Sequence, residues 1–120
     1  MTVQTLRIGK TGENYAVNFL IEKKYSVIER NFRTKFGEID IIALKNNKYF
    51  FVEVKTRIGI AKGKPYEAVN KRKLKHLRYA SDIYVLKNNL KNFKLSLMVI
   101  SIILTRELQV DSINCFDIVE

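Results

Sequence analysis

A chain of 120 residues with 47% hydrophobic and 28% charged residues, five glycines and one proline has the size and composition of one globular domain, which excludes a disordered or fibrous chain. The formal net charge of +10 favours a polyanionic partner, and a single cysteine excludes an internal disulfide. No signal-peptide core and no membrane-length apolar run occurs. We therefore expect one cytoplasmic domain, residues 1–120, without membrane contact.

In chain order, the apolar pattern predicts a helix, three strands, a second helix and two further strands, which places the chain in the α/β class. The first helix is expected at residues 6–24 and the second at residues 66–87. The strands are expected at residues 25–32, 37–45, 48–57 and 94–104 and within 109–119. Asn46-Asn47 suits a two-residue hairpin turn, because asparagine tolerates the positive φ angles of such turns.

The first helix carries one carboxylate, Glu13, where an apolar side chain is expected. At 100° per residue it falls in the middle of the stripe that should face the sheet. That stripe consists of Leu6, Gly9, Ala16, Val17 and Leu20. Glu13 either pairs with a lysine or arginine in the core or points to the same site as acids on the strands. Gly9 and Gly12 would permit a close approach of the helix to the sheet or to a phosphate.

The second and third strands are apolar except for Asp40, Glu53 and Lys55, and charges inside a sheet are costly unless they are paired or bind a metal. A turn at Asn46-Asn47 places Asp40 opposite Glu53 and Glu38 opposite Lys55 on one face of the sheet. The other face would carry Ile39, Ile41, Val52 and Val54. Two opposed carboxylates repel each other and favour a hard cation such as Mg²⁺ between them. The structural alternative is a salt-bridged triad.

Ten basic residues lie between positions 62 and 94, against two acidic ones, and this concentration is typical of nucleic-acid binding. The candidate phosphate-binding residues are Lys62, Lys64, Lys71, Arg72, Lys73, Lys75 and Arg78. Phosphate contacts alone carry no sequence information, and nothing in this segment suggests that base edges are read. The alternative is an ordinary solvated helix face.

Together these features resemble the restriction-endonuclease-like superfamily, whose PD-(D/E)xK motif places an Asp before a Glu-x-Lys on neighbouring strands. Here the residues are Asp40 and the run Glu53-Val54-Lys55. The chain is more closely similar to the bacterial YraN family, which is related in fold to archaeal Holliday-junction resolvases. Five blocks carry this resemblance in order and spacing: GENYA, ERNFR, GEIDIIA, FVEVKTR and EAVNKRK.

The resemblance implies a restriction-endonuclease-like core, with a mixed sheet of about five strands flanked by helices, and a nuclease site of Glu13, Asp40, Glu53 and Lys55. Asp40, Glu53 and the backbone carbonyl of Val54 would hold Mg²⁺ or Mn²⁺, with Glu13 as a direct or water-mediated ligand. Lys55 would orient or deprotonate the attacking water. The implied function is a metal-dependent DNA endonuclease, including on branched or junction DNA, that acts as a homodimer.

Two alternatives stay open: a non-catalytic nucleic-acid-binding protein on a nuclease fold, and an adaptor whose basic face binds an acidic protein. Two positions depart from the family pattern. Ile39 stands where the superfamily motif has proline, and Ser96 stands where relatives tend to have an acid.

Overall fold

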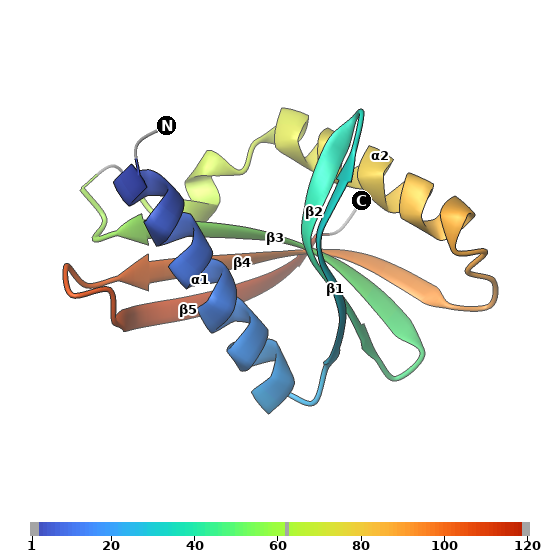
Figure 1. Ribbon diagram of the computed structural model, residues 1–120, viewed down its shortest axis with the longest axis horizontal. Coiled ribbons are helices and arrows are strands. Elements are labelled where there is room, and N and C mark those ends of the chain that lie inside the picture. Colours follow the sequence, from blue (N-terminus) through green and yellow to red (C-terminus); the bar gives the residue numbers. More distant parts are fainter. Residues whose placement is uncertain (1–2, 62, 119–120) are drawn as a thin grey trace.

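The computed structural model describes residues 3–61 and 63–118, and its elements follow the predicted order (Figure 1). They are α1 (Val3–Glu22), β1 (Ser26–Thr34), β2 (Gly37–Lys45), β3 (Lys48–Ile58), η1 (Pro65–Ala68), α2 (Lys71–Lys87), β4 (Lys94–Leu104) and β5 (Val110–Ile118). The sheet has the order β1-β2-β3-β4-β5, with β3 and β4 parallel and the other neighbours antiparallel. The α/β class and the mixed five-stranded sheet are confirmed.

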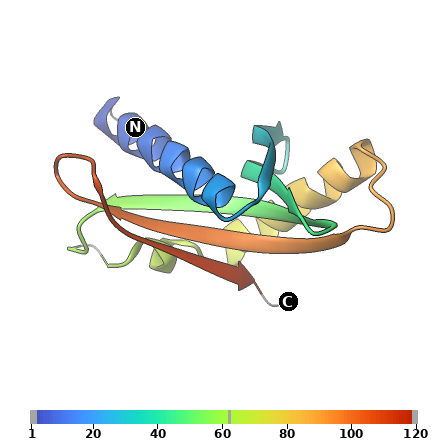
Figure 2. The same cartoon turned by 90° about the horizontal axis from the view of Figure 1, so that it is seen from below.

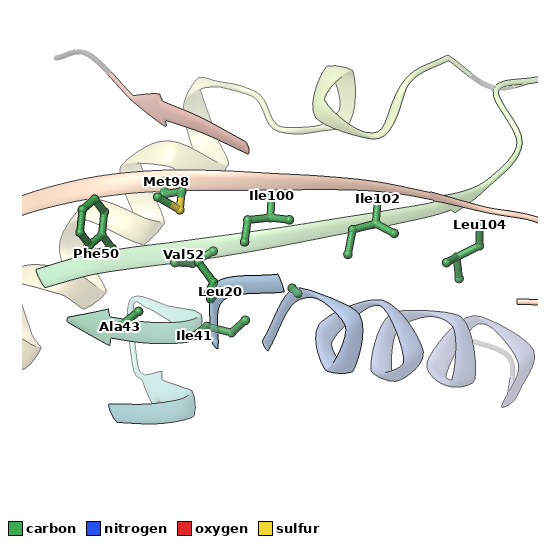
Figure 3. Close-up of a cluster of buried hydrophobic side chains, with 10 residues drawn as sticks. Leu20, Ile41, Ala43, Phe50, Val52, Met98, Ile100, Ile102 and Leu104 are labelled. Atoms are coloured by element: carbon green, nitrogen blue, oxygen red, sulfur yellow. The ribbon is translucent and has the colours of Figure 1, made fainter. Parts of the chain in front are cut away.

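Apolar side chains fill both faces of the sheet, which explains why β2, β3 and β4 read as nearly continuous apolar runs. The cluster under α1 (Figure 3) contains Ala16, Leu20, Ile41, Ala43, Phe50, Val52, Met98, Ile100, Ile102 and Leu104. The cluster under α2 contains Phe32, Ile39, Ile42, Phe51, Leu77, Ala80, Tyr84 and Leu97. Figure 2 shows α1 lying along one side of the strands. The two helices therefore hold the sheet between them.

The β2–β3 hairpin has the predicted turn and register over its first five pairs. Asn46 and Asn47 have φ angles of 51° and 62°, and the ladder runs from Lys45↔Lys48 to Ile41↔Val52. Beyond that pair β2 leaves β3 and continues with β1 as a hairpin that turns away from the sheet (Figure 1). The two strands thus form a fork, and the second half of β3 has a ladder partner only in β4.

Three details differ from the sequence-based expectations. Ile39 packs under α2 and Ile41 under α1, so they do not share a face, because β2 twists where it leaves β3. Leu6 is exposed and does not belong to the buried stripe of α1. The second helix begins at Lys71, where Asn70 caps it by accepting the N–H of Lys73 at 3.0 Å, and only the short η1 turn precedes it. No helix in the described part of the chain is long and apolar enough to cross a bilayer.

Candidate functional site

An open cleft of about 1260 Å³ lies at the fork of the sheet, between α1, β1, β2 and β3. Its lining includes Glu13, Asp40, Glu53, Lys55 and Val54, which come from α1, β2 and β3. The fold therefore brings together all the residues that the sequence assigns to the nuclease site. We call this feature the acidic cleft.

Asp40 is fixed in the acidic cleft by the backbone of β3. Its side chain is 6% exposed, and its Oδ2 atom accepts the N–H of Val54 at 2.7 Å. The β2–β3 ladder ends at Ile41↔Val52, so the Val54 N–H has no backbone acceptor on β2. The Asp40 carboxylate accepts this N–H instead. The hydrogen bond therefore links the two arms of the fork.

Burial makes the charged forms of the three cleft acids costly. The pKa of Asp40 is raised to about 8, first by burial and then by the nearby Glu53, while the Val54 N–H acts in the opposite direction. Burial also raises the pKa of Glu53, which Lys73 and then Lys55 counteract. Burial raises the pKa of Glu13 above its usual value, and Arg30 offsets part of that rise. A cation in the cleft would offset the cost of ionising these groups.

Glu13 reaches the cleft because α1 packs closely on β3. A Cβ atom at Gly12 would overlap the side chain of Thr56, so only glycine permits this separation of helix and strand. Gly9 has open space around its Cα, and it lines the cleft without a close contact. The Glu13 Oε1 atom lies 3.8 Å from Arg30 Nη2. Glu13 therefore has a basic partner and also faces the site of Asp40 and Glu53.

Lys73 lies closer to the acids than its assignment to the phosphate-binding surface suggests. It precedes the buried Leu77, Ala80 and Tyr84 by four, seven and eleven residues, so it extends the face of α2 that packs on the sheet. It lines a hollow that also contains Glu53. The pKa of Lys55 is lowered by burial and then by Lys73 and Arg57. The helical spacing of Lys73 was the signal in the sequence that could have identified it.

The predicted ladder positions, with Asp40 opposite Glu53 and Glu38 opposite Lys55, are wrong, although Asp40 and Glu53 line the same cleft. The ladder ends before these positions, and the Glu38 Oε2 atom instead lies 3.6 Å from Arg33 Nε. Three arginines that the sequence reasoning did not assign to the site also line the cleft: Arg30, Arg33 and Arg57. Within the described residues, the Nε atom of Arg57 is buried and has no hydrogen-bond partner. Arg57 lies two residues after Lys55 on β3, so both side chains are expected on the same face of the strand. This spacing is the sequence signal that could identify Arg57 as a site residue.

The predicted phosphate-binding residues that the structure describes have exposed side chains, namely Lys64, Lys71, Arg72, Lys73, Lys75 and Arg78. Lys62 lies outside the described residues. The Arg78 Nε atom lies 3.7 Å from Asp82 Oδ1. We call Lys71, Arg72, Lys75 and Arg78 the basic surface of α2.

Asp40 and Glu53 are the candidate ligands for a hard divalent cation in the cleft. Among residues 3–61 and 63–118, no three Asp, Glu, His or Cys side chains are close enough to form a cluster that could hold a metal ion by themselves. Mg²⁺ does not need such a cluster, because it is held by one or two carboxylates and keeps several waters. Asp40 and Glu53, with the Val54 carbonyl next to Glu53 in the chain, provide that smaller set. The raised pKa values of both carboxyls, to which Glu53 contributes at Asp40, are what a cation between them would offset.

Ser96, the position that departs from the family pattern, lies on β4 opposite Phe50, and it does not line the acidic cleft. It lines a separate hollow beside α2. The departure therefore removes no group from the candidate site.

The fold and the cleft together define an α/β domain with acids and a lysine gathered at the fork of a mixed sheet. The model of the "Uncharacterised protein family UPF0102" matches residues 12–120. Similar proteins carry the name UPF0102 protein: one of Clostridioides difficile is 43% identical over 80% of this chain and 84% of its own, and one of Caldanaerobacter subterraneus is 37% identical over 89% and 88%. The chain belongs to the UPF0102 family, which is the YraN family.

Proposed function

We propose that this protein is a metal-dependent endonuclease that hydrolyses phosphodiester bonds in DNA, including branched or junction DNA, with Mg²⁺ or Mn²⁺ as its cofactor. The observation that carries the proposal is the placement of the buried Asp40, the half-buried Glu53 and Lys55 in one open cleft. A fold gains no stability from two neighbouring carboxyls that desolvation and mutual repulsion make costly to ionise, whereas a catalytic site requires such perturbed groups.

In this proposal each cleft residue has a separate task. Asp40, Glu53 and the Val54 carbonyl hold the metal ion, and Glu13 supports it directly or through water. When bound, the ion polarises the scissile phosphate and acidifies a coordinated water. Lys55, whose pKa is lowered, orients the attacking water or takes its proton. Arg57 has a buried guanidinium nitrogen with an unused N–H and is suited to the charge that develops on the phosphate.

The charge distribution around the cleft supports a nucleic-acid substrate. The basic surface of α2 is exposed, and Lys73 connects that helix to the hollow beside Glu53. A phosphate backbone that follows the basic surface would therefore be guided towards the cleft acids. We expect the protein to act in the cytoplasm.

The experiment is a cleavage assay with purified protein on labelled duplex, single-stranded, flap and four-way-junction DNA, with Mg²⁺, Mn²⁺ or chelator. We expect metal-dependent cleavage of at least one substrate by the wild type and none by Asp40→Asn prepared in the same way, which controls for contaminating nucleases. A folded wild-type protein that cuts none of these substrates with either metal would contradict the proposal. Binding without cleavage would favour the non-catalytic alternative.

A further inference from the structure

An exposed phenylalanine lies at the tip of the β1–β2 hairpin, residues 34–37, where Thr34 and Gly37 line a hollow that also reaches Glu53. Phe36 is 57% exposed, although turn positions of this kind are usually occupied by polar residues or glycine. Water contact at an aromatic ring costs free energy, and no described residue of the chain forms a ring contact with Phe36. Single exposed apolar side chains are common on protein surfaces, so the case for a partner rests on what surrounds this ring.

The structure holds the hairpin tip in one conformation. The Thr34 hydroxyl donates to the Gly37 carbonyl at 2.7 Å and accepts the N–H of Phe36 at 3.1 Å. At Gly37, a Cβ atom would lie 2.6 Å from the backbone oxygen of His76, so the tip is in close contact with α2. Phe32, further along β1, packs edge-on against Tyr84 of the same helix. The backbone that carries Phe36 is therefore held by hydrogen bonds within the hairpin and by contact with α2, which reduces the entropy lost on binding.

The surroundings of Phe36 are cationic and lead to the site. Arg33 and Lys35 flank the tip and are exposed. Arg33 also lines a hollow of about 370 Å³ between the hairpin and α2, together with Lys73, His76 and Glu53 of the acidic cleft. The ion pair of Arg33 with Glu38 is largely solvent-exposed, so Arg33 can exchange it for a phosphate at little cost. The tip, the hollow and the cleft thus form one continuous surface.

We propose that Phe36 stacks on an unpaired DNA base a few nucleotides from the phosphate in the acidic cleft, while Arg33 and Lys35 bind the flanking phosphates. An aromatic ring among cations is the usual platform for single-stranded nucleic acid. In a continuous duplex the bases already stack on each other, so the ring gains a partner only where a base is unpaired or unstacked, as at a branch or a flap. The hairpin tip would then select DNA structure without reading sequence. This inference specifies the substrate of the proposed nuclease and rests on that function.

The test measures binding without metal, in chelator, so that it does not depend on cleavage. The probes are a fully paired duplex and the same duplex with a short flap that carries 2-aminopurine as its first unpaired base. For Phe36→Ala we expect the affinity for the flap to fall about ten-fold, which is the range for loss of one stacked base. Its affinity for the duplex should stay within about two-fold of wild type, because the phosphate contacts remain. The fluorescence quenching that stacking causes in the wild type should disappear.

Two variants serve as controls. Phe36→Tyr keeps the ring and should behave as wild type, and Leu86→Ala removes another exposed apolar side chain, 81% exposed and on α2, and should change neither affinity. Equal flap affinities for Phe36→Ala and wild type would overturn the inference, even if the wild type cleaves DNA. Conversely, a ring-dependent preference for the flap in a protein that cleaves nothing would support the hairpin contact and refute the nuclease proposal.

Discussion

At the scale of single residues, Asp40 has one observed task and one proposed task, which can be separated by substitution. Its carboxylate accepts the Val54 N–H and also carries the charge that a metal would bind. Asp40→Asn keeps an acceptor oxygen and removes the charge, whereas Asp40→Ala removes both. We expect Asp40→Ala to lose about 1–3 kcal/mol of unfolding free energy, because the Val54 N–H is left without a partner, and Asp40→Asn to lose none at pH 8. Chemical denaturation of the three proteins at that pH compares them.

The raised pKa of Asp40 predicts how stability depends on pH in metal-free protein. Because the folded-state pKa is about 8 and the unfolded value is 3.8, the folded state binds the proton more tightly. The free energy of unfolding should therefore decrease as the pH rises from about 4 to about 8, by a few kcal/mol in order of magnitude, and this decrease should be smaller in Asp40→Asn. Denaturation curves across that range measure it. A wild type whose stability rises over the same window would contradict the raised pKa.

Added Mg²⁺ should restore the free energy of unfolding that the metal-free wild type loses at high pH, since a ligand that binds only the folded state stabilises it by mass action. We expect the melting temperature of the wild type at pH 8.5 to rise with Mg²⁺ concentration and that of Asp40→Asn to stay constant. Equal shifts in both proteins would indicate that the ion binds elsewhere. A salt-bridged triad predicts instead that loss of Asp40 or Glu53 alone destabilises the protein strongly, with no effect of Mg²⁺.

Lys55 can be tested separately from the acids, because its proposed task concerns the water and not the ion. Lys55→Ala should bind Mg²⁺ and DNA as the wild type does and cleave about 10²–10⁴-fold more slowly. Single-turnover cleavage rates and metal titrations by melting temperature measure the two effects. Cleavage at the wild-type rate would remove Lys55 from the chemistry.

At the scale of elements, the packing of α1 on β3 depends on one glycine, and α1 offers a matched control. Gly12→Ala would place a methyl group against Thr56 and move α1 away from β3. We expect a loss of about 1–3 kcal/mol of unfolding free energy, together with a displaced Glu13. Gly9→Ala meets no atom within 4 Å and should stabilise the helix by up to about 1 kcal/mol. Equal effects of both substitutions on denaturation midpoints would contradict this account.

Element order and hairpin register could be predicted from sequence because each has a local cause. Asn46 and Asn47 fix a two-residue turn, and the length of that turn fixes the pairing as far as Ile41↔Val52. The failures at Ile39 and Glu38 have one cause: alternation assumes a straight strand, and the point where β2 leaves β3 depends on packing against α2. The start of α2 was misplaced because Pro65 and Asn70 are both favourable near a helix start, and only tertiary contacts decide between them.

The site was predictable to the extent that it follows helix and strand periodicity. Asp40, Glu53 and Lys55 stand out as charges in apolar strands, and Glu13 stands out on the apolar stripe of α1. Lys73 has the same kind of signal, but it lies in a run of basic residues that conceals it. The hydrogen bond from Val54 to Asp40 could not be predicted, because it exists only where the ladder stops.

At the scale of the whole molecule, the basic surface of α2 should dominate the salt dependence of DNA binding. Replacing Lys71, Arg72 and Lys75 with Gln should reduce the slope of log affinity against log salt concentration by about one for each phosphate that the variant no longer neutralises, on every DNA sequence alike. The matched control replaces Lys87, Lys91 and Lys94 with Gln, which removes the same charge at and beyond the C-terminal end of α2. Fluorescence anisotropy at several salt concentrations gives both slopes. Identical slopes in the two variants would show that only net charge matters.

The homodimer stays a prediction, which light scattering at about micromolar concentrations tests.

The hydrogen bond between Asp40 and Val54 also affects how this position can change during evolution. A lineage that abandons metal chemistry no longer needs a charge there, but it still needs an acceptor for the Val54 N–H. Asparagine would meet the structural need alone, whereas alanine would leave the fork of the sheet without its link. Within the UPF0102 family, a protein with asparagine at this position would thus keep the link between the strands but lack the charge that the proposed metal site requires. Substitution by a residue without an acceptor would require a compensating change on β3.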